Sequence, residues 1–448
     1  IMPKTRGKTP KKSLSAKGVP KTITTSATIF SRAQVGIFLF TYISYIIVYM
    51  NRKALTNTKT VLQKEQVFSE KELGGLDTAF LTTYALAQFA SGGMEAALGS
   101  KRSMVLCFLG TSVCTYLFGT STDSNIRWAA WALNGLFQAM FYPFVMSILT
   151  EWFPPSVRGR VLGLWGTCPQ IAGFTCNVFA SYVLSKNSML VWQDAFMRPA
   201  YLGISMAVAC LTLLPTPSSA PAEPSQTKKA KEDRLSFFQV LGMQNVSNLG
   251  GAYLFIKLVR YTFIAWLPSY LVEIVGYSDT EALLYFTVFD IAGAFGSVGS
   301  GFIADILFEG KSVKTVLPMC FMCSYATFIY PHVALYGKMQ NMVMMGFIGI
   351  MIAGPDCVLG SAACAEVCEQ AGQPKAIATA SGIVNGLGSV GAIASGLLPV
   401  YIKNQYGWTG VFYTQGILSL LGLLCILPMG LSGMQHLKKE ENKAKKQK

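Results

Sequence analysis

The chain has 448 residues, of which 52% are hydrophobic and only 13% are charged. Charged residues make up about a quarter of a typical soluble domain, so the composition excludes a soluble protein of this length. The aromatic content excludes a disordered chain, and 11 cysteines in so long a chain exclude a small disulfide scaffold. We therefore expect the lipid bilayer to surround most of the chain.

Apolar stretches long enough to cross a bilayer recur along the whole sequence. A membrane helix needs about 20 mainly apolar residues. Twelve such stretches predict an all-α integral membrane protein with twelve transmembrane helices. In chain order they are 34–54, 74–98, 103–121, 126–151, 158–184, 196–215, 245–275, 282–307, 315–335, 341–368, 376–402 and 408–433.

Basic residues are concentrated at the two ends of the chain and in every second connection. Residues 1–33 hold eight Lys or Arg and no acid, and residues 434–448 hold six Lys against two Glu. The positive-inside rule then places both tails and the middle loop in the cytoplasm. The net charge of +15 follows from this topology, so we expect no nucleic-acid partner. Segment 1–33 also has the composition of a transit peptide, but it lacks an amphipathic apolar face, which favours a cytoplasmic tail.

A polar, proline-rich stretch divides the predicted spans six and six. This arrangement predicts two pseudo-symmetric six-helix bundles related by an axis along the membrane normal. Small residues at four-residue spacing, as in Gly293–Ser297–Gly301, Gly382–Gly386 and Gly388–Ala392–Gly396, predict close helix packing. The expected division is a basic tail 1–33, a first bundle 34–215, a linker 216–240, a second bundle 241–433 and a basic tail 434–448.

Among the charged residues within the apolar stretches, where charge is costly and usually functional, two arginines are singled out. Arg260 lies deep in the seventh span, with Lys257 one turn before it. Arg52 follows Tyr45 and Tyr49 on one face of the first span, in the place that corresponds to Arg260 in the other half. The alternative for Arg52 is an anchor at the end of a helix, and for Arg260 a side chain that snorkels to the interface.

Two arginines that face one cavity from opposite bundles predict an anionic ligand. A guanidinium offers a rigid pair of donors to phosphate or carboxylate, and a divalent anion cancels the repulsion between two cations. Phosphate fits better than a monocarboxylate because it supplies two charges. For the other polar residues the alternative is an ordinary interhelical hydrogen bond. The predicted binding residues are Arg52, Arg260, Lys53, Lys257, Tyr45, Tyr49, Tyr84, Gln138, Tyr261 and Asp290.

Several motifs resemble those of the organophosphate:phosphate antiporter family of the major facilitator superfamily, and the details look closest to the eukaryotic sugar-phosphate exchangers and glycerol-3-phosphate transporters. The motifs cover both halves of the chain: Asn51-Arg52-Lys53, Leu133-Asn134-Gly135-Leu136-Phe137-Gln138, Lys257-Leu258-Val259-Arg260-Tyr261, Gly354-Pro355 and Gly386-Leu387-Gly388. The resemblance implies the major facilitator fold, phosphoryl binding by Arg52 and Arg260, and inorganic phosphate as the counter-substrate. No metal or cofactor is expected.

The chain departs from the bacterial members of that family at the remainder of the site. Gln88 stands where they have Lys, Pro169 where they have His, and Ala265 where they have Asp, while an acid survives as Asp290. The identity of the organic moiety and any proton coupling are therefore left open.

A further resemblance concerns the loop that major facilitator proteins carry after the second and eighth helices. Gly301, Asp305, Gly310 and Lys311 match it, whereas the copy that ends at Lys101 and Arg102 has lost its acid. An acid at a helix end can engage basic residues of the other bundle and hold one conformer closed. The predicted gating residues are Asp305, Lys101, Arg102 and Arg158.

We therefore expect a monomeric transporter that exchanges glycerol 3-phosphate or a hexose phosphate for inorganic phosphate by alternating access. The alternative is a major facilitator carrier of a carboxylate without phosphate exchange. A phosphatase needs a nucleophile with acid–base partners, and the chain has only two histidines, so we expect no enzyme. A non-transporting sensor is a further alternative. The endoplasmic reticulum, the plasma membrane and other organelles all fit the sequence.

Overall fold

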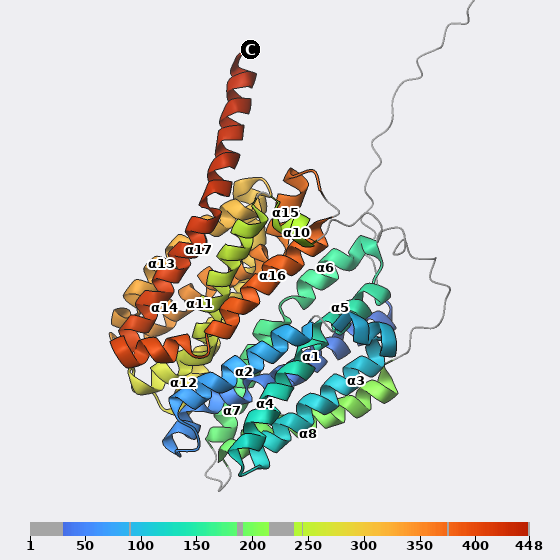
Figure 1. Cartoon of the computed structure of the whole chain (residues 1–448), viewed down its shortest axis with the longest axis vertical. Coiled ribbons are helices and arrows are strands. Elements are labelled where there is room, and N and C mark those ends of the chain that lie inside the picture. The colour runs from blue at the N-terminus through green and yellow to red at the C-terminus, as the bar shows by residue number, and fades with distance from the viewer. Residues whose placement is uncertain are drawn as a thin grey trace, which may run out of the picture.

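The structure is a computed structural model that describes residues 30–88, 91–185, 191–214, 237–243, 245–373 and 376–446. Within these ranges, 91–96, 155–156, 158–160, 191, 378 and 431–446 are described by their backbone alone. All regular structure in the described part is helical (Figure 1). Most of the linker predicted at 216–240 and most of the tail predicted at 1–33 lie outside the described residues.

The described part of the first half of the chain forms eight helical segments. In chain order they are α1 (Arg32–Lys64), α2 (Glu70–Gln88), α3 (Ser91–Thr120), α4 (Ser124–Ala139), α5 (Phe141–Trp152), α6 (Pro155–Trp165), α7 (Cys168–Leu184) and α8 (Val191–Leu213).

The second half repeats the pattern after a short helix. Its segments are α10 (Phe237–Leu241), α11 (Val246–Glu273), α12 (Asp279–Phe308), α13 (Ser312–Val333), α14 (Lys338–Leu359), α15 (Ala362–Gln370), α16 (Ile377–Ala394) and α17 (Leu398–Lys446).

The helix ends follow local sequence signals. Ser31 and Ser278 each accept a hydrogen bond from the backbone N–H three residues on, and the side chain at that position bonds back, which is a capping box. Gly99 and Gly407 interrupt α3 and α17 with positive φ angles of 76° and 66°, a conformation that favours glycine. The break at Gly99 separates the second predicted span from the third.

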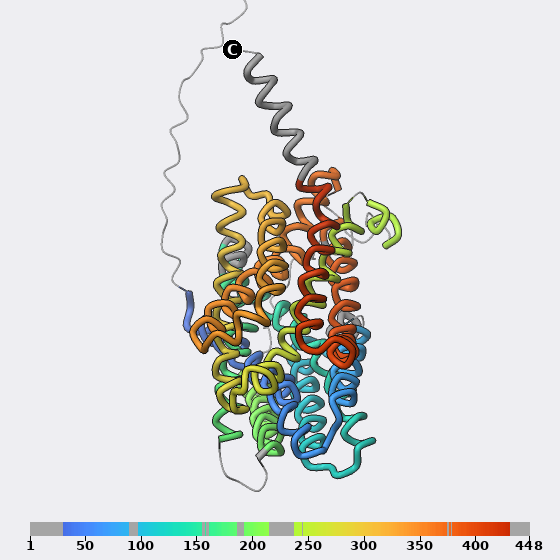
Figure 2. The backbone as a smooth tube through the Cα atoms, turned by 90° about the vertical axis from the view of Figure 1, so that its left-hand side faces the viewer, coloured from blue at the N-terminus to red at the C-terminus, as the bar shows by residue number. Residues whose placement is uncertain are grey.

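Among the described residues, eight helical stretches are long and apolar enough to cross a membrane, by length and composition. The four other predicted spans correspond to α2, to α6 with α7, to α11 and to α16, which are short, interrupted or carry charged side chains. Figure 2 shows the helices as a roughly parallel bundle along the long axis of the molecule. The prediction of twelve spans is consistent with this arrangement.

Two predicted boundaries were wrong in ways that affect the site. The first helix does not end near residue 54, because α1 continues to Lys64 and includes Asn57, Thr58 and Lys59 as buried residues. Arg52 is therefore inside a long helix, and the alternative of an anchor at its end no longer applies. The tenth span also ends early: α14 stops at Leu359, and α15 is a separate helix in which Glu366 accepts a hydrogen bond from the Val313 N–H at the start of α13.

The two halves of the chain form two groups of helices that lie side by side (Figure 1). Within the first group α2 packs against α4 and α3 against α8, and within the second α11 packs against α16 and α12 against α14. The groups meet where α7 contacts α12, α2 contacts α16 and α1 contacts α11. A large apolar cluster extends across this junction, from Leu55 and Phe80 of the first half to Trp266 and Tyr270 of the second.

The prediction of close packing at the small residues holds only in part. A Cβ atom on Gly388 would lie 2.7 Å from the Tyr253 ring, and one on Gly396 would lie 2.3 Å from the Thr78 hydroxyl, so these positions need glycine. Gly301, Gly382 and Gly386 have no described atom within 4 Å of the place a Cβ would occupy. Four-residue spacing identifies a small-residue face of a helix but not whether another helix covers that face.

Candidate functional site

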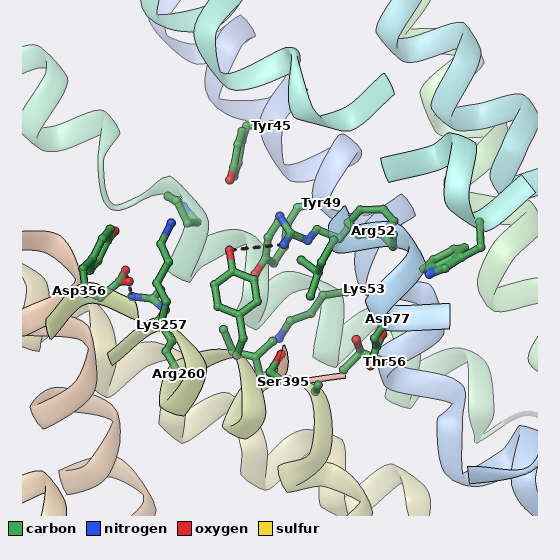
Figure 3. Close-up of a pocket in the computed structure, with 18 residues that line it drawn as sticks. Tyr45, Tyr49, Arg52, Lys53, Thr56, Asp77, Lys257, Arg260, Asp356 and Ser395 are labelled. Atoms are coloured by element: carbon green, nitrogen blue, oxygen red, sulfur yellow. Dashed lines mark hydrogen bonds and ion pairs between the residues drawn. The ribbon is translucent and has the colours of Figure 1, made fainter. Parts of the chain in front are cut away.

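A cavity of about 220 Å³ lies between the two halves of the molecule (Figure 3). Side chains of α1, α2 and α7 line it on one side and those of α11 and α14 on the other. The lining mixes aromatic rings with charged groups, a combination that suits a small polar ligand. Its charged members are Arg52, Lys53, Asp77, Lys257, Arg260 and Asp356.

Arg52 is held in the cavity by aromatic rings. Its guanidinium carbon lies 5.0 Å from the centre of the Tyr84 ring, 5.3 Å from Phe80 and 5.7 Å from Tyr261. One guanidinium nitrogen also donates to the Tyr261 hydroxyl across the junction at 3.5 Å. Stacking on rings fixes the direction of a guanidinium without neutralising its charge. Arg52 forms no ion pair with a described carboxylate.

Arg260 has a different environment, because it is paired with an acid. Its Nη1 atom donates to Asp356 Oδ2 at 2.6 Å, from α11 to α14. Both side chains are about one-sixth exposed, at 17% and 18%, so the pair borders the cavity rather than lying in the packed core. The other carboxylate oxygen, Oδ1, is buried without a hydrogen-bond partner among the described residues.

Lys257 stands beside this pair, one helical turn before Arg260. Its ammonium group lies 4.8 Å from the centre of the Tyr253 ring, and it forms no ion pair with a described acid. Figure 3 shows Lys257, Arg260 and Asp356 together on one side of the cavity, with Arg52 on the other.

Lys53 joins the two halves through a buried network. Its ammonium group donates to Asp290 Oδ2 at 3.1 Å and to Asn177 Oδ1 at 3.3 Å, and Asn177 donates to the same Asp290 oxygen at 2.9 Å. Lys53 is 2% exposed and Asp290 10%. A Cβ atom on Gly173 would lie 2.6 Å from Asp290 Oδ2, so glycine provides the space for this carboxylate.

Lys59 makes a second buried link between the halves. It pairs with Asp77 within the first half and donates to the Ala265 carbonyl of α11 at 3.1 Å. Its ammonium group also lies 3.7 Å from the centre of the Trp266 ring. Lys59 is thus surrounded by partners from both halves.

The charges of the site sum to an excess of two cations. Five basic side chains lie in the cavity or against it, and three carboxylates pair with three of them: Lys53 with Asp290, Lys59 with Asp77, and Arg260 with Asp356. Arg52 and Lys257 are left without a carboxylate among the described side chains. A buried site of this charge attracts an anion.

Seven of the ten predicted binding residues line the cavity. Tyr84 and Gln138 line a small adjoining pocket behind Arg52, where Gln138 donates to Thr111 and Asn134 at 3.0 Å each. Asp290 lines another small pocket beside Arg260 and is engaged by Lys53. The residues in the main cavity are Tyr45, Tyr49, Arg52, Lys53, Lys257, Arg260 and Tyr261.

None of the predicted gating residues with a described side chain lines the cavity. Asp305 is exposed near the end of α12 and makes no ion pair with a described side chain. Lys101 donates to the Leu214 carbonyl within the same half at 2.6 Å, and Arg102 is exposed. The side chain of Arg158 lies outside the described residues.

Apart from the buried pair of Lys53 and Asp290, the ion pairs between described residues of the two halves occur at the opposite end of the molecule. Lys64 at the end of α1 pairs with Asp279 at the start of α12, with 2.7 Å between Nζ and Oδ2. Lys403 Nζ lies 2.7 Å from carboxylate oxygens of both Glu70 and Glu273. Hydrogen bonds between described residues of the two halves begin at this end, with Lys64 and Lys403. The last of them along the junction is the bond that Gln170 donates to the Ser297 hydroxyl.

Sequence reasoning missed Asp356, Asp77 and Lys59. Asp356 directly follows Gly354-Pro355, and as an acid in the middle of an apolar stretch it was as visible as Arg260. Lys59 was placed in a connection because the first span was predicted too short. Asp77 lies in a span whose start was set at residue 74, so its charge was visible as well.

Comparison with known proteins identifies the fold and the family. A sequence profile of the Major Facilitator Superfamily matches residues 41–373. The chain therefore belongs to the major facilitator superfamily of membrane transporters, and it is a carrier rather than an enzyme.

Two similar proteins align with this chain over most of their length. Sugar phosphate exchanger 3 of Mus musculus is 27% identical over 90% of this chain and 94% of its own length. A provisionally named glycerol-3-phosphate transporter 2 of Arabidopsis thaliana is 27% identical over 86% of this chain and 84% of its own. The resemblance predicted from the motifs is confirmed.

A solved structure shares the fold. A bacterial homologue of the lysosomal transporter Spinster, in an inward-facing and unoccupied conformation, superposes with a TM-score of 0.66. The superposition covers 89% of this chain and 95% of that one at 15% identity. The predicted major facilitator fold is confirmed.

Proposed function

We propose that this transporter carries a phosphate monoester, with glycerol 3-phosphate or a hexose phosphate as the cargo class, in exchange for inorganic phosphate. The phosphoryl group binds in the cavity between Arg52 and Arg260, and Lys257 supplies a further cation. The names of the similar proteins from Mus musculus and Arabidopsis thaliana support this class of cargo.

The charge of the cavity is the observation that carries the proposal. Arg52 and Lys257 leave two positive charges that no carboxylate of the described side chains pairs with. A phosphate monoester near neutral pH carries nearly two negative charges and three acceptor oxygens. Arg52 projects from the first half and Lys257 and Arg260 from the second, so a bound phosphoryl group draws the two halves together.

Alternating access follows from the same geometry. The halves are joined at the end that contains Lys64, Asp279 and Lys403. Under the predicted topology this end faces away from the cytoplasm, which supports a state that opens toward the cytoplasm. Two cations from opposite halves repel each other in the empty carrier, and an anion between them removes that repulsion. Occlusion therefore occurs with cargo bound, which favours exchange over net flow.

Phosphate self-exchange in proteoliposomes tests the proposal. Arg52→Lys and Arg260→Lys are each expected to lower the exchange rate at least tenfold, because an ammonium group cannot reproduce the bidentate contact of a guanidinium. Arg198→Lys is a matched control, since Arg198 pairs with Asp194 on the same helix outside the cavity. Wild-type rates in both cavity variants would exclude the clamp. Uptake of a carboxylate that phosphate fails to inhibit would favour the alternative carrier.

A further inference from the structure

Asp356 contributes an acid to a cavity that is otherwise suited to anions. Its carboxylate lies beside Arg260 and Lys257 in the lining of the cavity, across from Arg52 (Figure 3). A negative charge at this place repels an anionic cargo, so we expect Asp356 to have a function of its own. The single hydrogen bond of its carboxylate and its exposure to the cavity indicate what that function is.

The carboxylate of Asp356 is held by one hydrogen bond. Oδ2 accepts from Arg260 at 2.6 Å, and Oδ1 has no partner among the described residues. Asp290, by contrast, accepts from both Lys53 and Asn177 and is 10% exposed. The pair of Arg260 with Asp356 is therefore the less firmly held of the two and the more accessible from the cavity.

A phosphoryl group and Asp356 compete for the same guanidinium. A phosphate offers two oxygens to the fork of donors, while Asp356 uses one of its own. The phosphoryl group can therefore take the place of Asp356 on Arg260. After this exchange the carboxylate is still present at the edge of the site, and its negative charge still contributes to the net charge that the cargo meets.

We propose that Asp356 is a resident counter-ion that sets the charge of the cargo. This inference rests on the proposed function and specifies it further. With Asp356 ionised, the cavity has two excess positive charges, which match a dianion and leave a third negative charge uncompensated beside the carboxylate. Asp356 thus selects dianionic phosphate esters against trianionic ones.

Two esters of nearly the same size separate these charges. Glycerol 3-phosphate is a dianion at pH 8, and 3-phosphoglycerate, which has a carboxylate in place of one alcohol, is a trianion. The experiment measures how strongly each inhibits uptake of labelled phosphate into proteoliposomes that contain the full chain and are preloaded with phosphate. The readout is the ratio of the two inhibition constants, which a change in the amount of folded protein does not alter.

Three variants set the excess positive charge of the cavity to known values. Asp356→Asn raises the excess to three, and we expect the preference for the dianion to fall about tenfold or to reverse. Lys257→Gln lowers the excess to one and is expected to strengthen discrimination against the trianion. The double variant Asp356→Asn/Lys257→Gln restores an excess of two, and its ratio is expected to return toward the wild-type value. Asp356→Glu retains the carboxylate and is expected to retain the ratio, which keeps the test decisive where Asp356→Asn fails to fold.

The outcomes distinguish this proposal from the proposed function. If the wild-type chain exchanges phosphate but the ratio is the same in Asp356→Asn, or if Asp356→Glu accepts both esters equally, the counter-ion role is wrong and the proposed function stands. If the wild-type chain carries neither phosphate nor either ester, the proposed function is wrong and the counter-ion role falls with it. A ratio that follows the charge of the three variants supports both.

Discussion

Gly74 of α2 and Gly396, in the turn between α16 and α17, meet backbone to backbone across the two halves of the transporter. A Cβ atom on Gly396 would lie 2.5 Å from the Gly74 carbonyl oxygen, and one on Gly74 would lie 2.6 Å from the Gly396 carbonyl oxygen. The Thr78 hydroxyl lies close to the same place and donates to the Ile393 carbonyl at 3.4 Å. The halves can close at this end only because neither position has a side chain.

The first prediction concerns this contact. Gly396→Ala places a methyl group where three backbone or hydroxyl atoms stand within 2.8 Å. Overpacking costs about 1–3 kcal/mol, and 1.4 kcal/mol corresponds to a factor of ten. We expect phosphate exchange in proteoliposomes to fall about tenfold, because alternating access requires the carrier to close at one end before it opens at the other.

Gly386→Ala, on the helix α16 that leads to Gly396, is the matched control. No described atom lies within 4 Å of the place its Cβ would occupy, so exchange is expected to stay within twofold of the wild-type rate. Equal losses in the two variants would indicate a general effect of glycine replacement in and just after α16 and would contradict a role of this contact in closure.

The second prediction concerns Lys403, which bridges Glu70 of the first half and Glu273 of the second. Lys403→Gln leaves two carboxylates facing each other across the junction, so closure at this end becomes less favourable. The experiment labels a cysteine introduced by Thr56→Cys in the cavity lining, in a chain that also carries Cys357→Ser. When Lys403→Gln is added, we expect this cysteine to react several-fold faster with a membrane-impermeant thiol reagent that is supplied from the side of Lys403.

Lys338→Gln is the control for this experiment. Lys338 pairs with Glu281 at 2.9 Å within the second half, and both side chains are exposed. Its removal is expected to leave the labelling rate unchanged. Unchanged labelling in Lys403→Gln as well would mean that the bridge does not hold this end closed.

The hydropathy pattern was sufficient to predict the fold, because lipid imposes helices on nearly every span. The charged cavity was partly predictable for a related reason: Arg52, Lys257 and Arg260 interrupt apolar stretches in which charge is rare. The position of Arg52 was less certain than that of Arg260 because the first span was predicted to end beside it. The structure resolves this, since α1 continues for twelve residues beyond Arg52, to Lys64.

The pairing of charges was not predictable from spacing. Arg260 and Asp356 are separated by 96 residues and Lys53 and Asp290 by 237. Which acid meets which base depends on which helices are neighbours, and one sequence does not give that order. The same limit explains the small residues: Gly388 of α16 and Gly396 just after it face another helix, whereas Gly382 and Gly386 of α16 do not.

The third prediction concerns the buried pair of Lys53 and Asp290. Asp290→Asn removes the carboxylate and leaves the Lys53 ammonium group buried with amide partners alone. Breaking one side of a buried ion pair costs about 3–5 kcal/mol, so we expect a clear fall in the melting temperature in detergent. The double variant Lys53→Met/Asp290→Asn removes the unpaired charge, and we expect it to recover part of the loss.

The double-mutant cycle contains its own control. The amide of Asp290→Asn still reaches Asn177, so the contact between α7 and α12 is retained in both variants. Recovery in the double variant means that the cost comes from the unpaired charge. Strictly additive losses from Lys53→Met and Asp290→Asn would contradict a coupled ion pair.

The last prediction concerns pH and follows from the charge of the cargo. The second pKa of a phosphate monoester is about 6, so lowering the pH from 8 to 5 converts about nine-tenths of the dianion into the monoanion. A cavity with two excess positive charges favours the dianion. We expect the KM for glycerol 3-phosphate, expressed as total concentration, to rise about tenfold over this range.

Sulfate is a dianion at both pH values, so its inhibition constant against phosphate uptake is expected to stay the same. A loss of sulfate inhibition at pH 5 would instead assign the pH dependence to a group of the protein. In Lys257→Gln, whose cavity has one excess charge, the monoanion fits better and the rise in KM is expected to be smaller. A KM that is independent of pH in the wild-type chain would contradict a dianionic cargo, and with it the match between the cavity charge and the phosphoryl group.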